Sequence, residues 1–290
     1  MFASQPALYW DEPWLQFRHL LVRQLAFSIC SPNILATLPT ELALKHAFKL
    51  HDNELWKTHF QNYHARLLFL DQHPQALERF VQQLKSTRLG LRFEMLIWFW
   101  LLDQDYHPYQ LLGHSIQKIA GAKTLGELDF VLFNQDSQKI EHWEVALKYY
   151  LAERDFTLTY WYGLNRSDTL LRKLNHFSQK QFQFENALEH KIEQRYAVLK
   201  GQLYLPLEPH QNIPLWVNAE RRFGYWGSII PPQSAAFYRL QRLEWICPQA
   251  QVSSQTAQWW SNGLYLQKDQ SNFYMFRSAS LLSCSSSTRE

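Results

Sequence analysis

The stretch from residue 126 to residue 148, GELDFVLFNQDSQKIEHWEVALK, constrains the fold more than any other part of this chain. Apolar residues recur at every second position in LGELDFVLF and again in HWEVALKYYL. This spacing is the two-residue period of a β-strand. The polar residues between the two runs supply a turn. The stretch therefore predicts an antiparallel β-hairpin.

The register of this hairpin decides where two acids lie. If the chain turns at residues 136–137, Asp129 falls directly opposite Glu144. Like charges in that position are destabilising, with Cβ atoms ~5 Å apart, and a divalent cation is the simplest neutraliser. A slip of one residue would send every side chain to the other face. A structural alternative leaves Asp129 on a solvated strand face and pairs Glu144 with Lys139 or His142.

A predicted helix before the hairpin contains a third acid. Residues 88–102, RLGLRFEMLIWFWLL, are apolar on nearly every side and include one acid, Glu94. Glutamate is almost never fully buried unless it is paired. We expect a strand at Tyr109–Ile119 between this helix and the hairpin, and a fourth core strand at Ala197–Pro206.

The order of a helix, three strands, a helix and a strand resembles the core of the PD-(D/E)XK nuclease superfamily. GELDFVL is similar to the Asp strand of that superfamily, WEVALK to its Glu-x-Lys strand, and Glu94 to the acid on its first core helix. The resemblance implies an α+β fold with a PD-(D/E)XK-like core over residues 86–206. A helical region over residues 1–85 would precede it, and an aromatic-rich region over residues 207–290 would follow.

A closer resemblance covers most of the chain. Blocks such as FRHLLVRQLAFSICSPNIL, WYGLNRSDTLLRKLNHFSQKQF and YAVLKGQLYLP resemble an uncharacterised bacterial family, domain of unknown function 1853. That family is itself placed among PD-(D/E)XK-like folds. The resemblance supports a fold more strongly than a function.

The acids and the resemblance together imply metal-assisted hydrolysis of phosphodiester bonds. Asp129, Glu144 and Glu94 would supply oxygen ligands to Mg²⁺ or Mn²⁺, which lowers the pKa of a bound water. Lys148 would orient the water or stabilise charge on the phosphate. The prediction is a metal-dependent endonuclease or exonuclease, with DNA favoured over RNA. The alternative is a nuclease-fold protein without turnover that binds nucleic acid or another protein.

One position departs from the superfamily pattern. Ala146 stands where the superfamily's lysine normally lies, two residues after the strand glutamate. Lys148 keeps the same facing but starts ~13 Å from Glu144, at ~3.3 Å per residue. A cross-strand ion pair between Glu127 and Lys148 is an alternative of equal weight.

A predicted helix that begins near Ser167 or Asp168 contains a set of basic residues. They are Arg172, Lys173, His176 and Lys180, and three of them are spaced four apart on one face. Such a stripe is able to follow a phosphate backbone. A solvated helix face is the more common explanation.

Aromatic rings alternate with cations between Trp216 and Trp226, where Arg221 and Arg222 stand together. Aromatic side chains stack bases at ~1–3 kcal/mol each in single-strand binders, so this segment is a second candidate for substrate contact. Packing of the rings onto the core is the more common outcome, because tryptophan is highly buried on average.

Composition limits the remaining classes. With 290 residues, 46% of them hydrophobic and 19% charged, the chain is long and apolar enough for a large core. A net charge of +3 permits nucleic-acid contact without arguing for it. Cys30, Cys247 and Cys284 lack zinc spacing or a disulfide framework, which favours a reduced, cytoplasmic setting. No signal peptide and no membrane-spanning run is evident.

Helical spacing extends through the N-terminal region. It is visible in Leu15–Ile29, Leu42–Leu50, Asn53–Leu70 and Gln75–Lys85. At the other end, the Ser-rich segment from Ser278 is expected to be mobile. The N-terminal helices are expected to pack as a cap on the core rather than to bind a ligand.

Overall fold

The computed structural model describes residues 11–121, 123–207, 212–254 and 258–277, and its centre is a mixed β-sheet. Across the sheet the strands run in the order β1-β2-β3-β7-β8-β11-β10-β9. Their bounds are β1 Tyr109–Ala120, β2 Lys123–Asn134, β3 Lys139–Ala152, β7 Gln194–Pro206, β8 Gly224–Gly227, β9 Phe237–Arg239, β10 Gly263–Gln267 and β11 Phe273–Phe276. Short strands β4 (Trp161–Tyr162), β5 (Asn186–Ala187) and β6 (His190–Lys191) lie outside this order.

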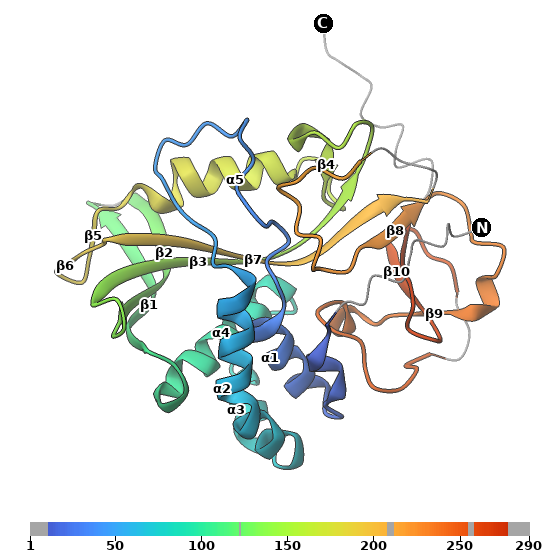
Figure 1. Cartoon of the computed structure of the whole chain (residues 1–290), viewed down its shortest axis with the longest axis horizontal. Helices are drawn as coiled ribbons and strands as arrows, with labels where there is room; N and C mark the ends of the chain where they lie inside the picture. The colour runs from blue at the N-terminus through green and yellow to red at the C-terminus, as the bar shows by residue number, and fades with distance from the viewer. Residues whose placement is uncertain (1–10, 122, 208–211, 255–257, 278–290) are drawn as a thin grey trace, which may run out of the picture.

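Helices cover both faces of the sheet (Figure 1). The helices α1 (Leu20–Cys30), α2 (Asn53–Gln72), α3 (Gln75–Val81) and α4 (Leu89–Leu102) lie on one side, and α5 (Leu170–Gln179) lies on the other. The protein is therefore α+β, and α4, β1, β2, β3, α5 and β7 follow one another in the predicted order. No helix within the described ranges has the length and apolarity needed to cross a membrane.

The β2–β3 hairpin has the predicted register. Phe130 pairs with Trp143, Val131 pairs with His142, and the turn occupies residues 135–138. Strand β2 is antiparallel to both neighbours, whereas β3 runs parallel to β7. The β2–β3 ladder ends at the Phe130–Trp143 pair, although β2 continues to pair with β1 beyond it. The two strands thus separate where Asp129 and Glu144 lie.

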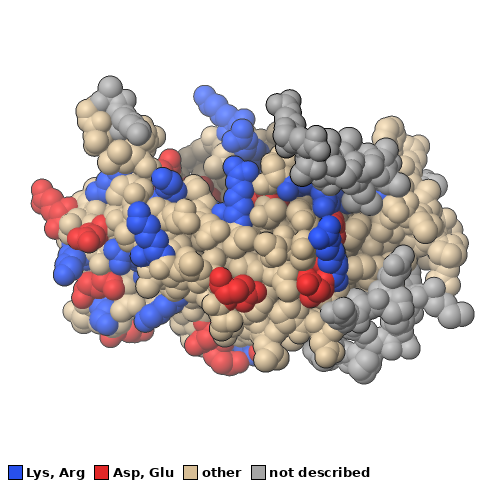
Figure 2. Space-filling view, turned by 90° about the horizontal axis from the view of Figure 1, so that it is seen from above, with Lys and Arg blue, Asp and Glu red and all other residues tan. Residues whose placement is uncertain are grey.

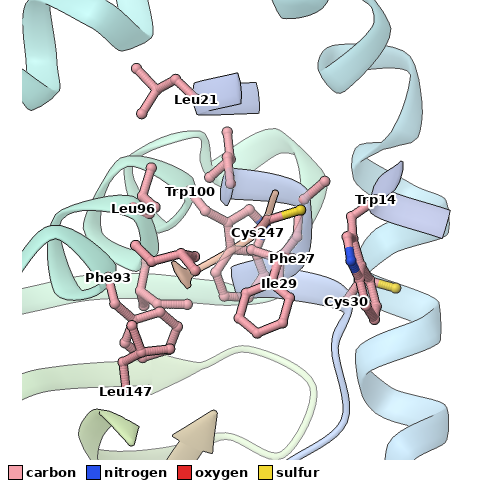
Figure 3. Packing of buried hydrophobic residues seen from close by; sticks show 14 of the residues in the cluster. Trp14, Leu21, Phe27, Ile29, Cys30, Phe93, Leu96, Trp100, Leu147 and Cys247 are labelled. Atoms are coloured by element: carbon pink, nitrogen blue, oxygen red, sulfur yellow. The ribbon is translucent and has the colours of Figure 1, made fainter. Parts of the chain in front are cut away.

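The alternation in β3 sorts its side chains between two cores. Trp143, Val145 and Leu147 pack with α4 residues such as Phe93 and Trp100, as Figure 3 shows for part of this cluster. The intervening residues of β3 face α5 instead, and Ala146 and Tyr150 belong to the cluster that contains Leu174 and Phe177. The first core also includes Trp14 and Cys247, so it joins all three predicted regions.

The chain from Leu42 to Leu50, predicted as a helix, contains none. Phe48 packs against the rings of Phe177 and Phe182, with centroids 5.8 and 5.0 Å away. Lys49 forms a bridge with the edge of β7 at Tyr196. Apolar residues in this loop are therefore buried by contacts with α5 and β7 and not by a helical face.

Helix α2 begins at Asn53, as predicted, whereas α5 begins at Leu170, after the predicted start near Ser167 or Asp168. Asp52 caps α2, because its carboxylate accepts a hydrogen bond of 2.8 Å from the Leu55 N–H. Thr169 caps α5 through a 3.1 Å bond from the Arg172 N–H. The C-terminal segment from Ser278, predicted to be mobile, lies outside the described residues.

Candidate active site

The carboxylates of Asp129 and Glu144 accept backbone hydrogen bonds at the point where β2 leaves β3. The Val145 N–H donates to Asp129 Oδ2 at 2.8 Å. The Asp129 N–H donates to Glu144 Oε1 at 3.4 Å. Backbone donors that a continued ladder would pair with carbonyls are thus paired with carboxylates. These two hydrogen bonds therefore hold the two acids close together where the strands separate.

The environment of this pair favours its protonated form. Burial raises the pKa of Glu144 to about 8, and this side chain is fully buried. Burial also raises the pKa of Asp129 well above its usual range, and the nearby Glu144 charge raises it further. Two carboxylates that share a site resist full ionisation unless a proton or a cation lies between them.

His142 and Gln181 hold the Glu144 carboxylate from two sides. His142 Nε2 lies 2.7 Å from Glu144 Oε1, and the Gln181 amide donates to Glu144 Oε2. Burial lowers the pKa of His142 to about 3, so the imidazole is neutral at pH 7. The contact is a hydrogen bond and not an ion pair. The contact of Glu144 with His142, which was the alternative to a metal site, is thus present. Glu144 keeps its contact with Asp129 as well.

Lys173 on α5 is the cation beside the two acids. Its Nζ donates to Gln181 Oε1 at 3.0 Å and lies 3.9 Å from the centroid of the Phe177 ring. Burial lowers the pKa of Lys173 to about 8, while the charges of Glu144 and Asp129 act in the opposite direction. The sequence placed Lys173 on a substrate-binding stripe, and it gave no signal for Gln181, which links this ammonium to Glu144.

Lys148 has a different partner from the one expected. Its Nζ lies 2.7 Å from Asp168 Oδ2, at the start of the α5 region. Glu127 is exposed and pairs with Gln117 of β1, beyond the point where β2 leaves β3. The cross-strand pair of Glu127 with Lys148 is therefore wrong, because the two strands have already diverged.

Gly201 fixes the backbone beside Lys148. Its φ is +130°, and a Cβ at this position would lie 1.8 Å from the Lys148 carbonyl oxygen. Only glycine fits a backbone that close and that conformation. This close approach explains the glycine in the middle of β7, where the backbone of Lys148 packs directly against that strand.

Glu94 is paired, as its apolar surroundings predict, but not with the other two acids. His114 Nε2 of β1 lies 2.8 Å from Glu94 Oε1, and the Ser115 hydroxyl lies 3.3 Å away. Among the residues that the structure describes, no three His, Cys, Asp or Glu side chains lie close enough to share a metal ion. The predicted three-carboxylate ligand set is therefore not assembled, and Asp129 with Glu144 forms a two-carboxylate site.

A pocket of about 660 Å³ opens over this site. Its polar lining includes Arg88, Glu94, Asp129, Lys148, Asp168, Lys173, Gln181 and Arg242. Glu94 and Asp129 thus face one cavity from different elements. Lys and Arg side chains are spread over the molecule on the α5 side (Figure 2). The pocket combines the carboxylates of Glu94, Asp129 and Asp168 with cations that are able to contact an anionic ligand.

The predicted basic stripe lies beside this pocket. A neighbouring cavity of about 500 Å³ beside α5 is lined by Asp168 and Lys173, which it shares with the carboxylate pocket, and by Arg172, His176 and Lys180. His176 Nδ1 contacts Gln181 Oε1 at 3.0 Å, and Arg172 donates to the Ser167 carbonyl at 2.9 Å. The stripe is therefore placed next to the acids, and its contact with substrate stays a prediction.

Arg221 and Arg222 are buried, which overturns their prediction as substrate contacts. Both pair with Glu12, at 2.9 and 2.7 Å. Arg222 also lies over the Phe273 ring at 4.6 Å. The two guanidinium groups join the N-terminal region to β7 and β11, so the packing alternative for this aromatic segment is the one that the structure shows.

Fold and site together define an α+β protein in which a carboxylate pair lies where two strands separate, beside a pocket lined by lysine and arginine side chains. The chain belongs to the family described as a domain of unknown function, DUF1853, whose model matches residues 23–278. The comparisons with curated proteins and with solved structures gave no match.

Proposed function

We propose that this protein is a metal-dependent nuclease that hydrolyses phosphodiester bonds, built on a PD-(D/E)XK-like core. The observation that supports this proposal most is the meeting of Asp129, Glu144 and Lys173 beside one open pocket. The order of elements from α4 to β7 and the parallel pairing of β3 with β7 agree with the resemblance in GELDFVL and WEVALK.

Asp129 and Glu144 fit a divalent cation. Burial raises the pKa of both groups, and the charge of Glu144 raises that of Asp129 further, so a bound cation would favour the ionised form of both carboxylates. Mg²⁺ is commonly held by one or two carboxylates together with substrate phosphate, so a third protein ligand is not required. When bound there, Mg²⁺ or Mn²⁺ would lower the pKa of a coordinated water and offset charge on the scissile phosphate.

The side chains around the acids have separable roles in this proposal. Lys173 takes the place of the lysine that is missing at Ala146, and its ammonium stabilises charge that develops on the phosphate. Its pKa of about 8 leaves it mostly protonated at pH 7. His142 and Gln181 fix the orientation of the Glu144 carboxylate. Lys148, already paired with Asp168, contributes to the charge of the pocket wall.

A nuclease-fold protein without turnover is the second candidate. Both oxygens of Glu144 already accept hydrogen bonds, and its side chain is fully buried. Such a protein would bind nucleic acid in the same pocket through its cations, with the carboxyl pair kept protonated.

The test is cleavage of labelled duplex DNA, single-stranded DNA and RNA with Mg²⁺ or Mn²⁺, comparing the native chain with Asp129→Asn. We expect metal-dependent cutting that falls ~10²-fold or more in the variant, the scale for losing one group that stabilises transition-state charge. Glu127→Gln is the matched control, because this exposed acid lies on the same strand and outside the pocket. Equal cutting by Asp129→Asn, or no cutting of any substrate by the native chain, would reject the nuclease.

A further inference from the structure

A second cavity, of about 590 Å³, lies beside the carboxylate pocket and shares part of its wall. Arg242 and Leu164 line both cavities. Trp245 lines the second cavity, and its carbonyl accepts a 2.8 Å hydrogen bond from the hydroxyl of Tyr149, a β3 residue that lines the first. The two cavities are thus neighbours joined by a hydrogen bond between their walls.

The lining of this second cavity has a consistent chemistry. Among the described residues, its wall contains two indole rings, two guanidinium groups and three side-chain amides, and no carboxylate. These residues are Trp245, Trp260, Arg239, Arg242, Gln241, Gln258 and Asn262. A ligand that suits such a wall is flat and aromatic, has hydrogen-bonding edges and carries negative charge. A nucleotide has all of these properties.

Trp260 provides an exposed stacking surface. Its side chain is 55% exposed, and the Arg239 guanidinium lies 5.6 Å from its ring centroid. Trp245 is covered, and Arg242 lies 4.1 Å from its ring centroid. An exposed indole is able to stack a base of any kind, and the guanidinium next to it is able to contact the adjoining phosphate.

Asn262 adds an amide group to the wall of this cavity. Its Oδ1 atom is buried and has no hydrogen-bond partner among the described residues, so the exocyclic amino group of a base would reach it only if the side chain turned towards the cavity.

We infer that this second cavity binds one unpaired base of a nucleic-acid strand whose neighbouring phosphate lies in the carboxylate pocket. The inference deepens the proposed nuclease and rests on it for the phosphate: its substrate class is single-stranded nucleic acid, or a strand with an unpaired end. A base held in a duplex is stacked on both faces and is not free to lie on Trp260.

The test is equilibrium binding of a short fluorescent DNA strand to the full chain in EDTA, where no metal-dependent cutting occurs. A strand of the same length made of abasic sugar-phosphate units is the second ligand. We expect Trp260→Ala to weaken binding of the base-bearing strand ~5- to 150-fold and to leave the abasic strand unchanged. Trp260→Phe, which keeps an aromatic ring, should recover most of the lost affinity.

Phe69→Ala is the matched control. Phe69 is 53% exposed on α2, and the Arg66 guanidinium lies 5.5 Å from its ring centroid, so it copies the Arg239–Trp260 pair far from the pocket. Unchanged affinity in Trp260→Ala, or an equal loss for both ligands, would overturn the base cavity. Base-dependent binding in a chain that cuts nothing would keep the cavity and reject the nuclease; cutting without any Trp260 effect would do the reverse.

Discussion

Two lysines lie on opposite faces of the central sheet, and their surroundings differ in kind. Lys173, on α5, donates to Gln181 and feels the charges of Asp129 and Glu144. Lys200, on β7, is fully buried on the side of α2, where its Nζ donates to the Ser31 carbonyl and lies 3.4 Å from the Trp56 ring centroid.

Burial is the largest influence on both lysines and lowers the pKa of each. Only Lys173 has carboxylates that favour its charged form, and only Lys173 lines a pocket within the described part of the chain. A desolvated ammonium next to acids at an open cavity is prepared for chemistry. The same group under an aromatic ring, away from acids, mainly opposes folding. Substitutions at either lysine, or at the acids beside Lys173, test this difference.

The largest effect is expected for Lys173→Met. Removal of this ammonium should lower metal-dependent cleavage ~10²- to 10³-fold, because its charge acts on both Asp129 and Glu144. Lys191→Met removes an exposed lysine of β6 that lines neither the carboxylate pocket nor the cavity beside α5, and it should retain cleavage within a few-fold. Rates at saturating Mg²⁺ with thermal unfolding of both variants decide the matter. Full activity in Lys173→Met would show that the two lysines do not differ in function.

A smaller effect is expected for Glu144→Gln, which removes one of the carboxylates that distinguish the two sites. The folded pKa of Glu144 is raised to about 8, so the folded chain keeps a proton that the unfolded chain loses above pH ~4.3. The unfolding free energy of the metal-free native chain should therefore fall as pH rises from ~4.3 towards 8.

Glu144→Gln should equal the native chain near pH 4 and exceed its stability at pH 8, by roughly 1–3 kcal/mol. Urea unfolding in EDTA across this range is the measurement. Glu127→Gln is the control, because Glu127 is exposed, whereas Glu141 is buried and accepts a hydrogen bond from Trp143. A difference that does not depend on pH would contradict the assigned protonation.

The smallest effect is expected for Lys200→Met. Because the folded pKa of Lys200 is lowered, the cost of its burial applies in full below that pKa and disappears as pH rises towards the unfolded value of ~10.4. Methionine fills a similar volume without charge, although it leaves the Ser31 carbonyl without its donor.

Lys200→Met should therefore be more stable than the native chain by ~1 kcal/mol at neutral pH, with a gap that narrows as pH rises. Urea unfolding of both chains between neutral and mildly alkaline pH measures this gap, and cleavage should not change. A variant that is much less stable at neutral pH would mean that Lys200 makes a net favourable contribution, which would remove the contrast with Lys173.

Interactions close in sequence were predictable from the residues alone. Alternation in β2 and β3 indicated which residues share a face, and a turn at residues 136–137 predicted the register that the structure has, although a one-residue slip stayed open. The pairing of Glu94 followed from one acid in an apolar helix, although its partner His114 did not.

Interactions between distant segments were not predictable in the same way. Gln181 reaches Glu144 only because α5 packs across β3, and Lys148 meets Asp168 only because β2 has already left. The basic pair Arg221 and Arg222 had the composition of a binding patch, yet Glu12, far away in the chain, buries both.

The sequence by itself determined the α+β order of elements, the hairpin and its carboxylate pair, because hydrophobic periodicity and turn residues act over a few neighbouring positions. Only the tertiary structure decided which lysine stands beside the acids, which arginines are buried, and that Trp245 and Trp260 line a cavity next to the carboxylates. Those outcomes depend on how helices and loops pack on the sheet, and packing joins residues whose separation along the chain leaves no local pattern.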